Sequence, residues 1–446
     1  MTFSLSDFHY DLPASLIAQK PPEVRGASRL MAVRKTDGRL EHALFARLDD
    51  YLPPDSLLVF NQARVVPARL LGRRAGFSGK VELLVLDPPL TEKAGSCELW
   101  CLGQPGRLLR PGTKLVFGGR SSDNFAGFEN SAGSDSSEGF DSFESSAGFE
   151  GAKNSAGFKS SDGSAGSDNS AVFKSSDGSA GSESSAGSES SASENSVDSK
   201  DSGGSGDAID METELTAEVV AVEPNGPRRL VRFDFKARPL AVLEKVGHLP
   251  LPPYIKRPDD EADFERYQTV YAKAPGAIAA PTAGLHFTRE HLQEIGKTHE
   301  TAMITLRVGA GTFAPLTEEQ LRTRRLHEEY AEVDEKTLRA VEKAKKQKRA
   351  VVAVGTTTAR ALEWAADWEE ERRTKGPFGG SCSLFIVPGR RFKTVDALLT
   401  NFHLPGSSLM LLVGAMLGQS LLLKAYQTAI EEKYRFFSYG DAMLIA

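Results

Sequence analysis

Three histidines and one aspartate stand in short polar segments from which they could transfer a proton. His286 follows the small residues of PTAGLHFT, His403 lies in TNFHLP, His327 begins HEEYAEV, and Asp441 lies in SYGDAM. An imidazole changes its charge near neutral pH and a carboxylate accepts a proton, so both groups are suited to acid–base chemistry. A loop histidine is also a common structural hydrogen-bonding group, and the residue types leave that alternative open.

Two further segments could bind an anion or let a ligand approach closely. Thr356, Thr357 and Arg360 stand where the apolar run AVVAV turns into a helical segment, and their amides and side chains could receive a carboxylate or a phosphate. A plain helix N-cap is the alternative. In VGAGTF, Gly309 and Gly311 would let the backbone approach a ligand, or would only make a tight turn.

Near the C-terminus a cation stands among aromatic side chains. Tyr434, Arg435, Phe436 and Phe437 follow one another, and this arrangement could stack on a flipped base or on an adenine. Consecutive aromatic residues are also typical of a hydrophobic core, so both interpretations remain.

Several function classes lose support from the motifs that are absent. The sequence has no G-x-S-x-G elbow, no G-x-x-x-x-G-K-[ST] phosphate loop and no H-E-x-x-H, which argues against standard hydrolases and nucleoside triphosphatases. Of three cysteines, Cys97 and Cys101 are spaced C-x3-C without nearby histidines, which predicts neither a disulfide framework nor a zinc site. The longest apolar run is too short to span a bilayer, so we expect a cytoplasmic protein that binds no membrane.

The segments that would hold these residues alternate between apolar strands and helices. AMITLRVGAGTF, AVVAVGTTTARALEW and LFIVPG followed by VDALLTNFHLP each end an apolar run in small polar residues. This rhythm predicts an α/β layer with largely parallel strands, in which ligands bind at the carboxyl ends of the strands. At the N-terminus, DFHYDLPASLIAQ predicts a helix, and SRLMAV and SLLVFNQARVVPARL add two strands.

Shorter alternating segments predict a second unit inserted into the first. KVELLVLD, LTAEVVAVEP and RRLVRFDF are separated by Gly, Pro and Asn turns, a pattern typical of a small antiparallel β-barrel. We therefore divide the chain into an α/β domain in two parts, residues 1–66 and 239–446, and a barrel domain, residues 67–238.

Residues 119–209 have a composition of their own. Ser, Gly, Ala, Asp and Glu dominate, FKSSDGSAGS occurs twice, and 16 acidic residues stand against 5 basic ones. Such a segment cannot bury enough apolar surface to fold, so we predict a disordered low-complexity insertion that expands one turn of the barrel. Since the whole chain has a formal net charge of -6, the remainder is mildly basic, which is compatible with contact to a phosphate backbone.

Seven strings, read together, point to one enzyme family. They are LPLPPYIKR, YQTVYA, AAPTAGLHFT, VGAGTF, AVGTTTAR, TNFHLP and YRFFSYGDAML. In this order they closely resemble the S-adenosylmethionine:tRNA ribosyltransferase-isomerases of queuosine biosynthesis. The resemblance begins at DFHYDLP and covers the chain apart from the low-complexity segment.

This resemblance implies a reaction, its substrates and a fold. The ribosyl part of S-adenosylmethionine would be transferred and isomerised onto 7-aminomethyl-7-deazaguanine at the wobble position of tRNA, giving epoxyqueuosine and releasing adenine and methionine. S-adenosylmethionine would be a co-substrate, with no prosthetic group and no metal, and the partner would be tRNA carrying that base. The implied fold, an α/β domain with an inserted β-barrel, agrees with the strand pattern above. We also expect a monomer.

We assign candidate roles to residues of the matching strings. The candidate catalytic residues are His286, His403, His327 and Asp441. For binding S-adenosylmethionine we assign Gly309, Gly311, Thr312, Thr356, Thr357, Arg360 and Arg307. For binding the tRNA substrate we assign Arg64, Asn61, Thr282, Asn401, Arg435, Phe436 and Tyr439.

Two positions depart from the family pattern. Arg307 stands in TLRVG where the family usually has TLHVG, and NQARV at 61–65 replaces N-[DN]-T-R-V, although Arg64 is retained. Either the missing imidazole is dispensable, or Arg307 takes over an anion-binding role, or the chain is impaired. A non-catalytic tRNA-binding module is therefore one alternative. A methyltransferase using S-adenosylmethionine is another, although its glycine-rich loop with a downstream acidic residue is not visible.

Overall fold

The computed structural model describes residues 4–118, 215–224, 226–313, 316–372 and 376–446. The insertion predicted at residues 119–209 lies outside these described residues.

A mixed sheet forms the centre of the α/β part. Within the described residues its strand order is β15-β13-β12-β3-β14-β16-β17-β1-β2. The pairs among β12, β3, β14 and β16 are parallel, as is β17 with β1. β16 pairs antiparallel with β17 inside the sheet, and β15, β13 and β2 pair antiparallel at its margins. The predicted α/β layer is confirmed, with antiparallel strands at both edges. The bounds are β1 Arg29–Val33, β2 Leu40–Leu44, β3 Leu57–Asn61, β12 Glu300–Leu306, β13 Arg325–Val333, β14 Val351–Val354, β15 Phe378–Leu384, β16 Ala397–Asn401 and β17 Ala442–Ile445.

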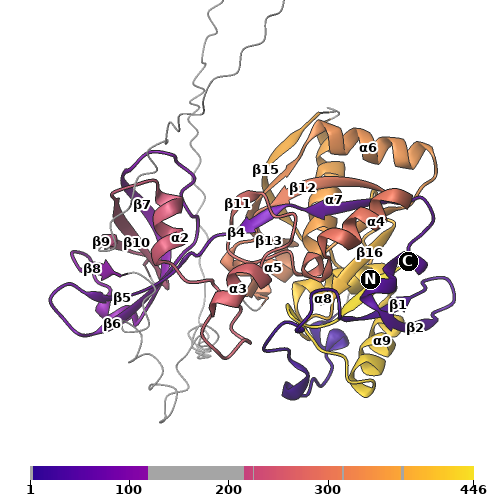
Figure 1. Cartoon of the computed structure of the whole chain (residues 1–446), viewed down its shortest axis with the longest axis horizontal. Helices are drawn as coiled ribbons and strands as arrows, with labels where there is room; N and C mark the ends of the chain where they lie inside the picture. Colours follow the sequence, from indigo (N-terminus) through magenta and orange to yellow (C-terminus); the bar gives the residue numbers. More distant parts are fainter. Residues whose placement is uncertain (1–3, 119–214, 225, 314–315, 373–375) are drawn as a thin grey trace, which may run out of the picture. The chain divides into compact units, whose positions relative to one another are not determined.

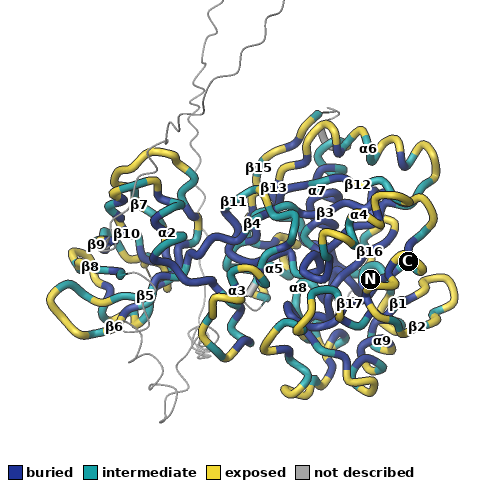
Figure 2. Tube along the Cα trace, in the orientation of Figure 1, coloured by how far each residue is buried: buried dark blue, intermediate teal, exposed yellow. Residues whose placement is uncertain are grey.

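The central strands are apolar throughout because both faces of the sheet are covered. Every residue of β3, β14, β16 and β17 is buried. Alternate side chains enter different cores: Leu57 and Val59 join one cluster, and Leu58 and Phe60 join another. Figure 2 shows this buried interior and the exposed outer turns of the helices around it.

Different elements supply the two cores. On the first face the sheet packs against α7 (Thr356–Arg372), α8 (Ser408–Leu417) and α9 (Gln419–Glu431), and on the second against η3 (Phe45–Asp50), η7 (Thr282–His286) and α4 (Arg289–Thr298) (Figure 1). The remaining α-helices described are α2 Pro239–Val246, α3 Glu261–Arg266, α5 Glu318–Thr323 and α6 Glu335–Lys346. Two further 3-10 helices are η4 Gly106–Leu108 and η8 Ala310–Phe313.

A closed antiparallel barrel has a separate core. Its strands follow the order β10-β7-β6-β5-β8-β9, and inward side chains such as Leu83, Phe117 and Phe233 form one cluster with α2. The predicted antiparallel barrel is confirmed. Its strands are β5 Arg69–Arg74, β6 Lys80–Val85, β7 Gly95–Gln104, β8 Lys114–Phe117, β9 Leu215–Val222 and β10 Arg228–Phe235. A two-stranded parallel ladder, β4 (Ala63–Val65) with β11 (Ala274–Ala277), lies outside both sheets.

The N-terminal segment differs from its prediction. DFHYDLPASLIAQ forms two short 3-10 turns, Leu5–Phe8 and Ala14–Leu16, and the predicted helix is wrong. Pro13 precedes the second turn with an extended backbone, and a proline at that point lacks the amide that a continuing helix needs.

Within the described residues, no single helix is long and apolar enough to cross a membrane. Among the described helices, α8 and α9 taken together pass that test of length and composition, and they are bent by 115° at their junction.

Candidate active site at the strand ends

One edge of the sheet collects residues from distant parts of the sequence. The parallel strands β12, β3, β14 and β16 all end there. Because β17 runs antiparallel to β16, and β1 runs parallel to β17, these two strands begin at the same edge. The edge therefore carries Ser28, Asn61, Gly309, Thr356, Asn401 and Asp441.

His286 is held at this edge through both ring nitrogens. Nδ1 lies 2.9 Å from Ser28 Oγ, and Nε2 lies 3.1 Å from Asn401 Nδ2. The same amide nitrogen lies 3.4 Å from the carbonyl oxygen of Asp441. These four residues form one connected set, which we call the histidine group.

The histidine group holds a neutral imidazole. Burial, and then the charges of Arg435 and Arg25, lower the pKa of His286 to about 3. Since the amide nitrogen of Asn401 can only donate, Nε2 accepts and Nδ1–H donates to Ser28. His286 therefore carries no charge near pH 7, and protein groups contact both of its nitrogens.

The Asp441 carboxylate joins the beginnings of two neighbouring strands. One oxygen accepts a hydrogen bond from the Arg29 amide at 2.9 Å, and the other accepts from the Arg435 amide at 2.8 Å. The Arg435 guanidinium also lies 3.8 Å from this carboxylate and remains partly exposed. Asp441 thus orders the backbone beside the histidine group.

A second set of residues fixes the glycine loop after β12. Glu329 Oε1 accepts hydrogen bonds from the Gly309 amide at 3.0 Å and from Thr312 Oγ1 at 3.2 Å. Its other oxygen pairs with Arg360 Nη1, and both side chains are almost completely buried. We call Gly309, Thr312, Glu329 and Arg360 the glycine-loop group.

The Glu329 carboxylate keeps Arg360 charged. Burial alone would lower the pKa of the guanidinium, but the charge of Glu329 and the hydrogen bond to it hold that pKa above its usual range. Arg360 Nη1 is thus occupied by a protein carboxylate, whereas Arg360 Nη2 is buried with no hydrogen-bond partner.

His327 packs directly on the glycine loop. A Cβ atom at Gly311 would lie 2.5 Å from atoms of the imidazole ring, so a side chain at that position would displace the ring. Burial lowers the pKa of His327, and its Nε2 is buried without a hydrogen-bond partner. A Cβ at Gly309, in contrast, would meet nothing within 4 Å, so the loop is open on that side.

Arg307 fills the space beside Gly276. A Cβ at Gly276, whose φ is +116°, would lie 3.0 Å from Arg307 Cδ. The guanidinium lies 4.6 Å from the centre of the Tyr330 ring, and Arg307 Nε is buried without a partner. The cation is therefore positioned by packing and a cation–π contact next to the glycine loop.

Asn61 connects three elements at the edge. Its Oδ1 accepts from the amides of Ala63 and Leu306, and its Nδ2 donates to the Leu306 carbonyl and to Thr357 Oγ1. Its side chain is fully buried, so it joins β3 to β12 and to the first turn of α7. Thr356, the first residue of α7, is also buried.

Two candidates lie inside the core of the α/β part. Burial lowers the pKa of His403 to about 3, and its Nε2 lies 2.7 Å from Thr400 Oγ1. Phe436 is completely buried, and its ring packs against Phe402 and Tyr426. Neither the imidazole nor the phenyl ring is exposed for contact with a bound base.

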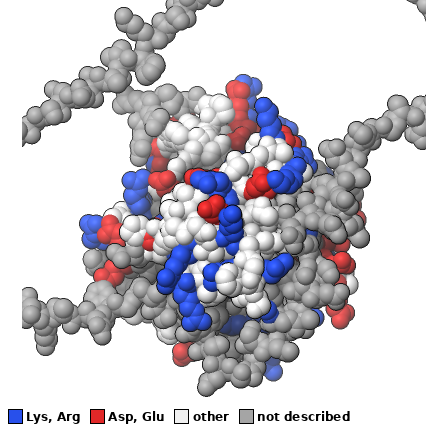
Figure 3. All heavy atoms as spheres, turned by 90° about the vertical axis from the view of Figure 1, so that its left-hand side faces the viewer, with Lys and Arg blue, Asp and Glu red and all other residues white. Residues whose placement is uncertain are grey.

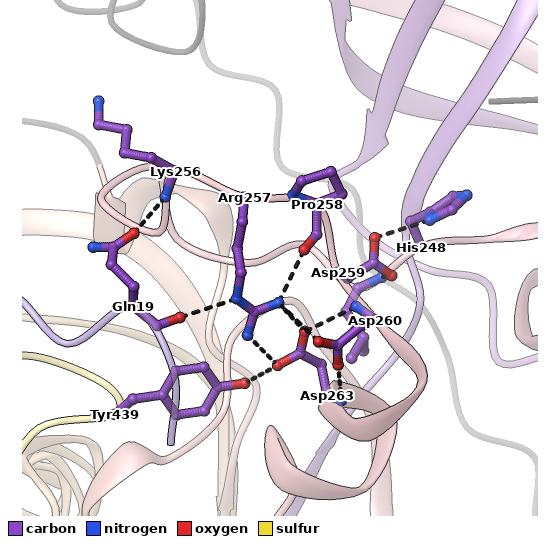
Figure 4. A network of polar contacts seen from close by, with 10 residues as sticks. Gln19, His248, Lys256, Arg257, Pro258, Asp259, Asp260, Asp263 and Tyr439 are labelled. Carbon is purple, nitrogen blue, oxygen red and sulfur yellow. Dashed lines mark hydrogen bonds and ion pairs between the residues drawn. The ribbon is translucent and has the colours of Figure 1, made fainter. Parts of the chain in front are cut away.

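Tyr439 belongs to a polar network that sequence patterns did not indicate. Its hydroxyl donates to Asp263 Oδ1 at 2.7 Å, and Arg257 binds both oxygens of the same carboxylate (Figure 4). Arg257 also donates to the carbonyl oxygen of Gln19. Although burial opposes it, the hydrogen bonds from Arg257, from the Asp260 amide and from Tyr439 lower the pKa of Asp263.

A narrow recess connects this network to the histidine group. Among its lining residues are Ser28, His286, Tyr439 and Gly440. Of the other predicted residues, Thr282 begins η7 and is half-buried, and Arg64 pairs with Glu244 at 2.7 Å.

Sequence reasoning missed Glu329, Ser28 and Asp263. For Glu329 a signal was present: it stands in the buried phase of β13 with Ala331 and Val333, where a charged side chain is unexpected. Ser28 and Asp263 carried no such signal. In the described part of the chain, no group of three or more His, Cys, Asp and Glu side chains could hold a metal ion.

Known proteins similar to this chain include a protein family, curated relatives and a solved structure. The family model of the queuosine biosynthesis protein matches residues 5–144 and 171–445. The S-adenosylmethionine:tRNA ribosyltransferase-isomerase of Syntrophotalea carbinolica is 38% identical over 443 residues, and that of Acetivibrio thermocellus is 35% identical, each covering 99% of both chains. The crystal structure of S-adenosylmethionine tRNA ribosyltransferase from Thermotoga maritima is 28% identical, with a TM-score of 0.43, and covers 99% of this chain and 100% of its own.

Proposed function

The chain belongs to the queuosine biosynthesis protein family, and from this premise we propose that it is an S-adenosylmethionine:tRNA ribosyltransferase-isomerase. It transfers and isomerises the ribosyl moiety of S-adenosylmethionine onto 7-aminomethyl-7-deazaguanine in tRNA, giving epoxyqueuosine and releasing adenine and methionine. The observation that carries this proposal is the convergence of the glycine loop, the start of α7, Asn401 and Asp441 on one edge of the sheet.

The glycine loop is the binding site that we propose for S-adenosylmethionine. Within the described residues, three buried nitrogens around it lack hydrogen-bond partners: Arg307 Nε, His327 Nε2 and Arg360 Nη2. Buried polar atoms are nearly always paired, so unpaired ones indicate a place for a polar ligand or water. The open side of Gly309 allows close approach of that ligand to the backbone.

His327 is the proton acceptor that we propose. The sulfonium of S-adenosylmethionine acidifies the adjacent ribose C5′ protons, so a neutral base positioned there can remove one and start the expulsion of adenine. His286 has protein contacts at both ring nitrogens, whereas His327 Nε2 has none. Because the pKa of His327 is lowered, its imidazole is neutral and able to accept a proton near pH 7.

One assay separates this function from its alternatives. The purified protein is incubated with S-adenosylmethionine and tRNA bearing 7-aminomethyl-7-deazaguanine, and the nucleoside and base products are separated by chromatography. We expect free adenine and methionine in equal amounts. Formation of S-adenosylhomocysteine would indicate a methyltransferase instead, and tRNA binding without turnover would indicate a binding module.

The proposed proton acceptor has its own test. His327→Gln keeps the size of the side chain and removes the titrating ring, so we expect adenine release to fall at least about 100-fold. The KM for S-adenosylmethionine should change little by comparison. Turnover within about threefold of the unsubstituted protein would exclude His327 from proton transfer.

A further inference from the structure

Two neighbouring segments of the barrel carry cations and no carboxylate. Residues 72–80 contain Arg73, Arg74 and Lys80, and residues 105–114 contain Arg107, Arg110 and Lys114, whereas neither segment contains Asp or Glu. We call these six side chains the basic barrel patch. The other described segments of the barrel contain carboxylates, among them Glu82, Glu98 and Asp234.

The two segments are side by side in the folded barrel. Arg73 faces Lys80 across the β5–β6 hairpin, and the Ala75 amide donates to the Lys114 carbonyl at 2.9 Å. A Cβ at Gly79 would lie 3.6 Å from Leu108 Cδ1, which places the hairpin turn against the second segment. Figure 3, which views the molecule from the side on which Figure 1 draws the barrel, shows lysine and arginine side chains gathered across the middle of this face.

Three cations of the patch, Arg107, Arg110 and Lys114, are less neutralised than several other cations of the barrel. Elsewhere on the barrel, Arg69 pairs with Glu82, Arg228 with Glu223 and Arg232 with Glu98. Arg107, Arg110 and Lys114 are exposed and form no ion pair with any described residue. The carboxylate opposite the patch in the strand register is Glu218, which faces Lys114.

An exposed aromatic side chain lies within the patch. Phe77 is 57% exposed at the turn after β5, and the Arg74 guanidinium lies 4.4 Å from the centre of its ring. Exposed cations next to an aromatic face are typical of surfaces that bind nucleic acid, because cations contact phosphates and the ring stacks on bases. An acidic protein partner would use the cations but would leave the phenyl ring without a role.

We propose that the basic barrel patch binds the phosphate backbone of the tRNA substrate. This inference rests on the proposed function for the identity of the RNA, and on the charges and exposure above for the surface. The patch contributes affinity and position, whereas the strand-edge site performs the chemistry.

The test compares a variant that lacks three charges of the patch with a variant that lacks three charges elsewhere on the chain. The patch variant is R107Q/R110Q/K114Q, and the control is K336Q/R339Q/K346Q on the exposed side of α6, with the same change in net charge. Binding to tRNA is measured by filter retention between 50 and 200 mM salt, and adenine release gives the KM for tRNA. Unfolding curves of both variants verify that they fold.

We expect the patch variant to bind tRNA about 10- to 100-fold more weakly at 150 mM salt. The plot of the logarithm of the association constant against the logarithm of the salt concentration should be shallower, with a slope smaller in magnitude by about 2 to 3. The KM for tRNA should rise in parallel, the KM for S-adenosylmethionine should stay constant, and Phe77→Ala should weaken tRNA binding further. Patch and control variants with equal affinity and equal slope would overturn the proposal. Polyglutamate serves as the probe for an acidic protein partner. A patch variant that loses binding to polyglutamate but retains binding to tRNA would also overturn the proposal.

The two proposals fail separately in this experiment. If the unsubstituted protein releases no adenine, the proposed function fails, yet filter retention still tests the patch. If it releases adenine and the patch variant matches the control, only the patch proposal fails.

Discussion

Removing the charge of Glu329 tests whether the glycine loop depends on a buried ion pair. In Glu329→Gln the side chain keeps its shape, but the buried Arg360 guanidinium loses its counter-charge. Breaking a buried pair by removing one partner costs about 3–5 kcal/mol, because an uncompensated charge remains in the interior. The amide also has one oxygen in place of the two that now serve Gly309, Thr312 and Arg360. We therefore expect a loss of about 3–5 kcal/mol in the free energy of unfolding.

The assay is urea unfolding followed by tryptophan fluorescence. Trp364 and Trp368 lie on the same helix as Arg360, whereas Trp100 lies in the barrel. A Trp100→Phe background therefore makes the signal report on the α/β part alone. The expected change is a lower midpoint at an unchanged denaturant slope.

The matched control removes both charges together. Glu329→Gln combined with Arg360→Met leaves no uncompensated charge, so the double variant should cost less than the sum of the single variants by about 2 kcal/mol or more. Because Glu329 anchors Gly309 and Thr312, the KM for S-adenosylmethionine should rise in Glu329→Gln. A loss below about 1 kcal/mol, or strictly additive single variants, would refute the reasoning.

Four further predictions follow from the same structure. The pKa of His403 is about 3 in the folded chain and about 6.5 in the unfolded chain. As pH falls below about 6.5, the unfolded chain takes up the proton first, so the folded state loses stability. His403→Gln should reduce the stability difference between pH 8 and pH 5 by about 2 kcal/mol, and an unchanged difference would show that His403 does not titrate this way. Gly311→Ala forces a Cβ against the His327 ring and should lower the free energy of unfolding by about 1–3 kcal/mol. Gly309→Ala, whose Cβ meets nothing within 4 Å, should lower it far less. Equal urea midpoints for the two variants would contradict this. Replacing residues 123–206 by a short turn should give soluble protein with equal or slightly higher stability and intact adenine release. The reason is that Phe117 on β8 and Leu215 on β9 are already paired neighbours. Insoluble protein would refute the insertion hypothesis. Arg307→Ala should raise the KM for S-adenosylmethionine, since the cation lies beside the glycine loop, and an unchanged KM and turnover would remove Arg307 from the site.

The sequence by itself determined the architecture and the edge at which to look. Apolar runs that end in small polar residues predicted an α/β layer, and Asn61, Gly309, Thr356 and Asn401 lie together at the strand ends as that pattern indicates. These inferences depend on local periodicity, which a single sequence carries. The predicted N-terminal helix is wrong because Pro13 has no amide hydrogen and an extended backbone, so the segment forms two separate 3-10 turns.

Only the tertiary structure decided which side chains meet. His286 contacts Ser28 and Asn401 because the sheet places β16, β17 and β1 side by side, an order that differs from the order in the sequence. Glu329 contacts Arg360 because α7 packs against β13. Burial likewise decided between the two interpretations of Phe436, whose ring is enclosed by the core. Partners of this kind depend on strand order and on how the two faces of the sheet are covered, and neither is encoded in the spacing of neighbouring residues.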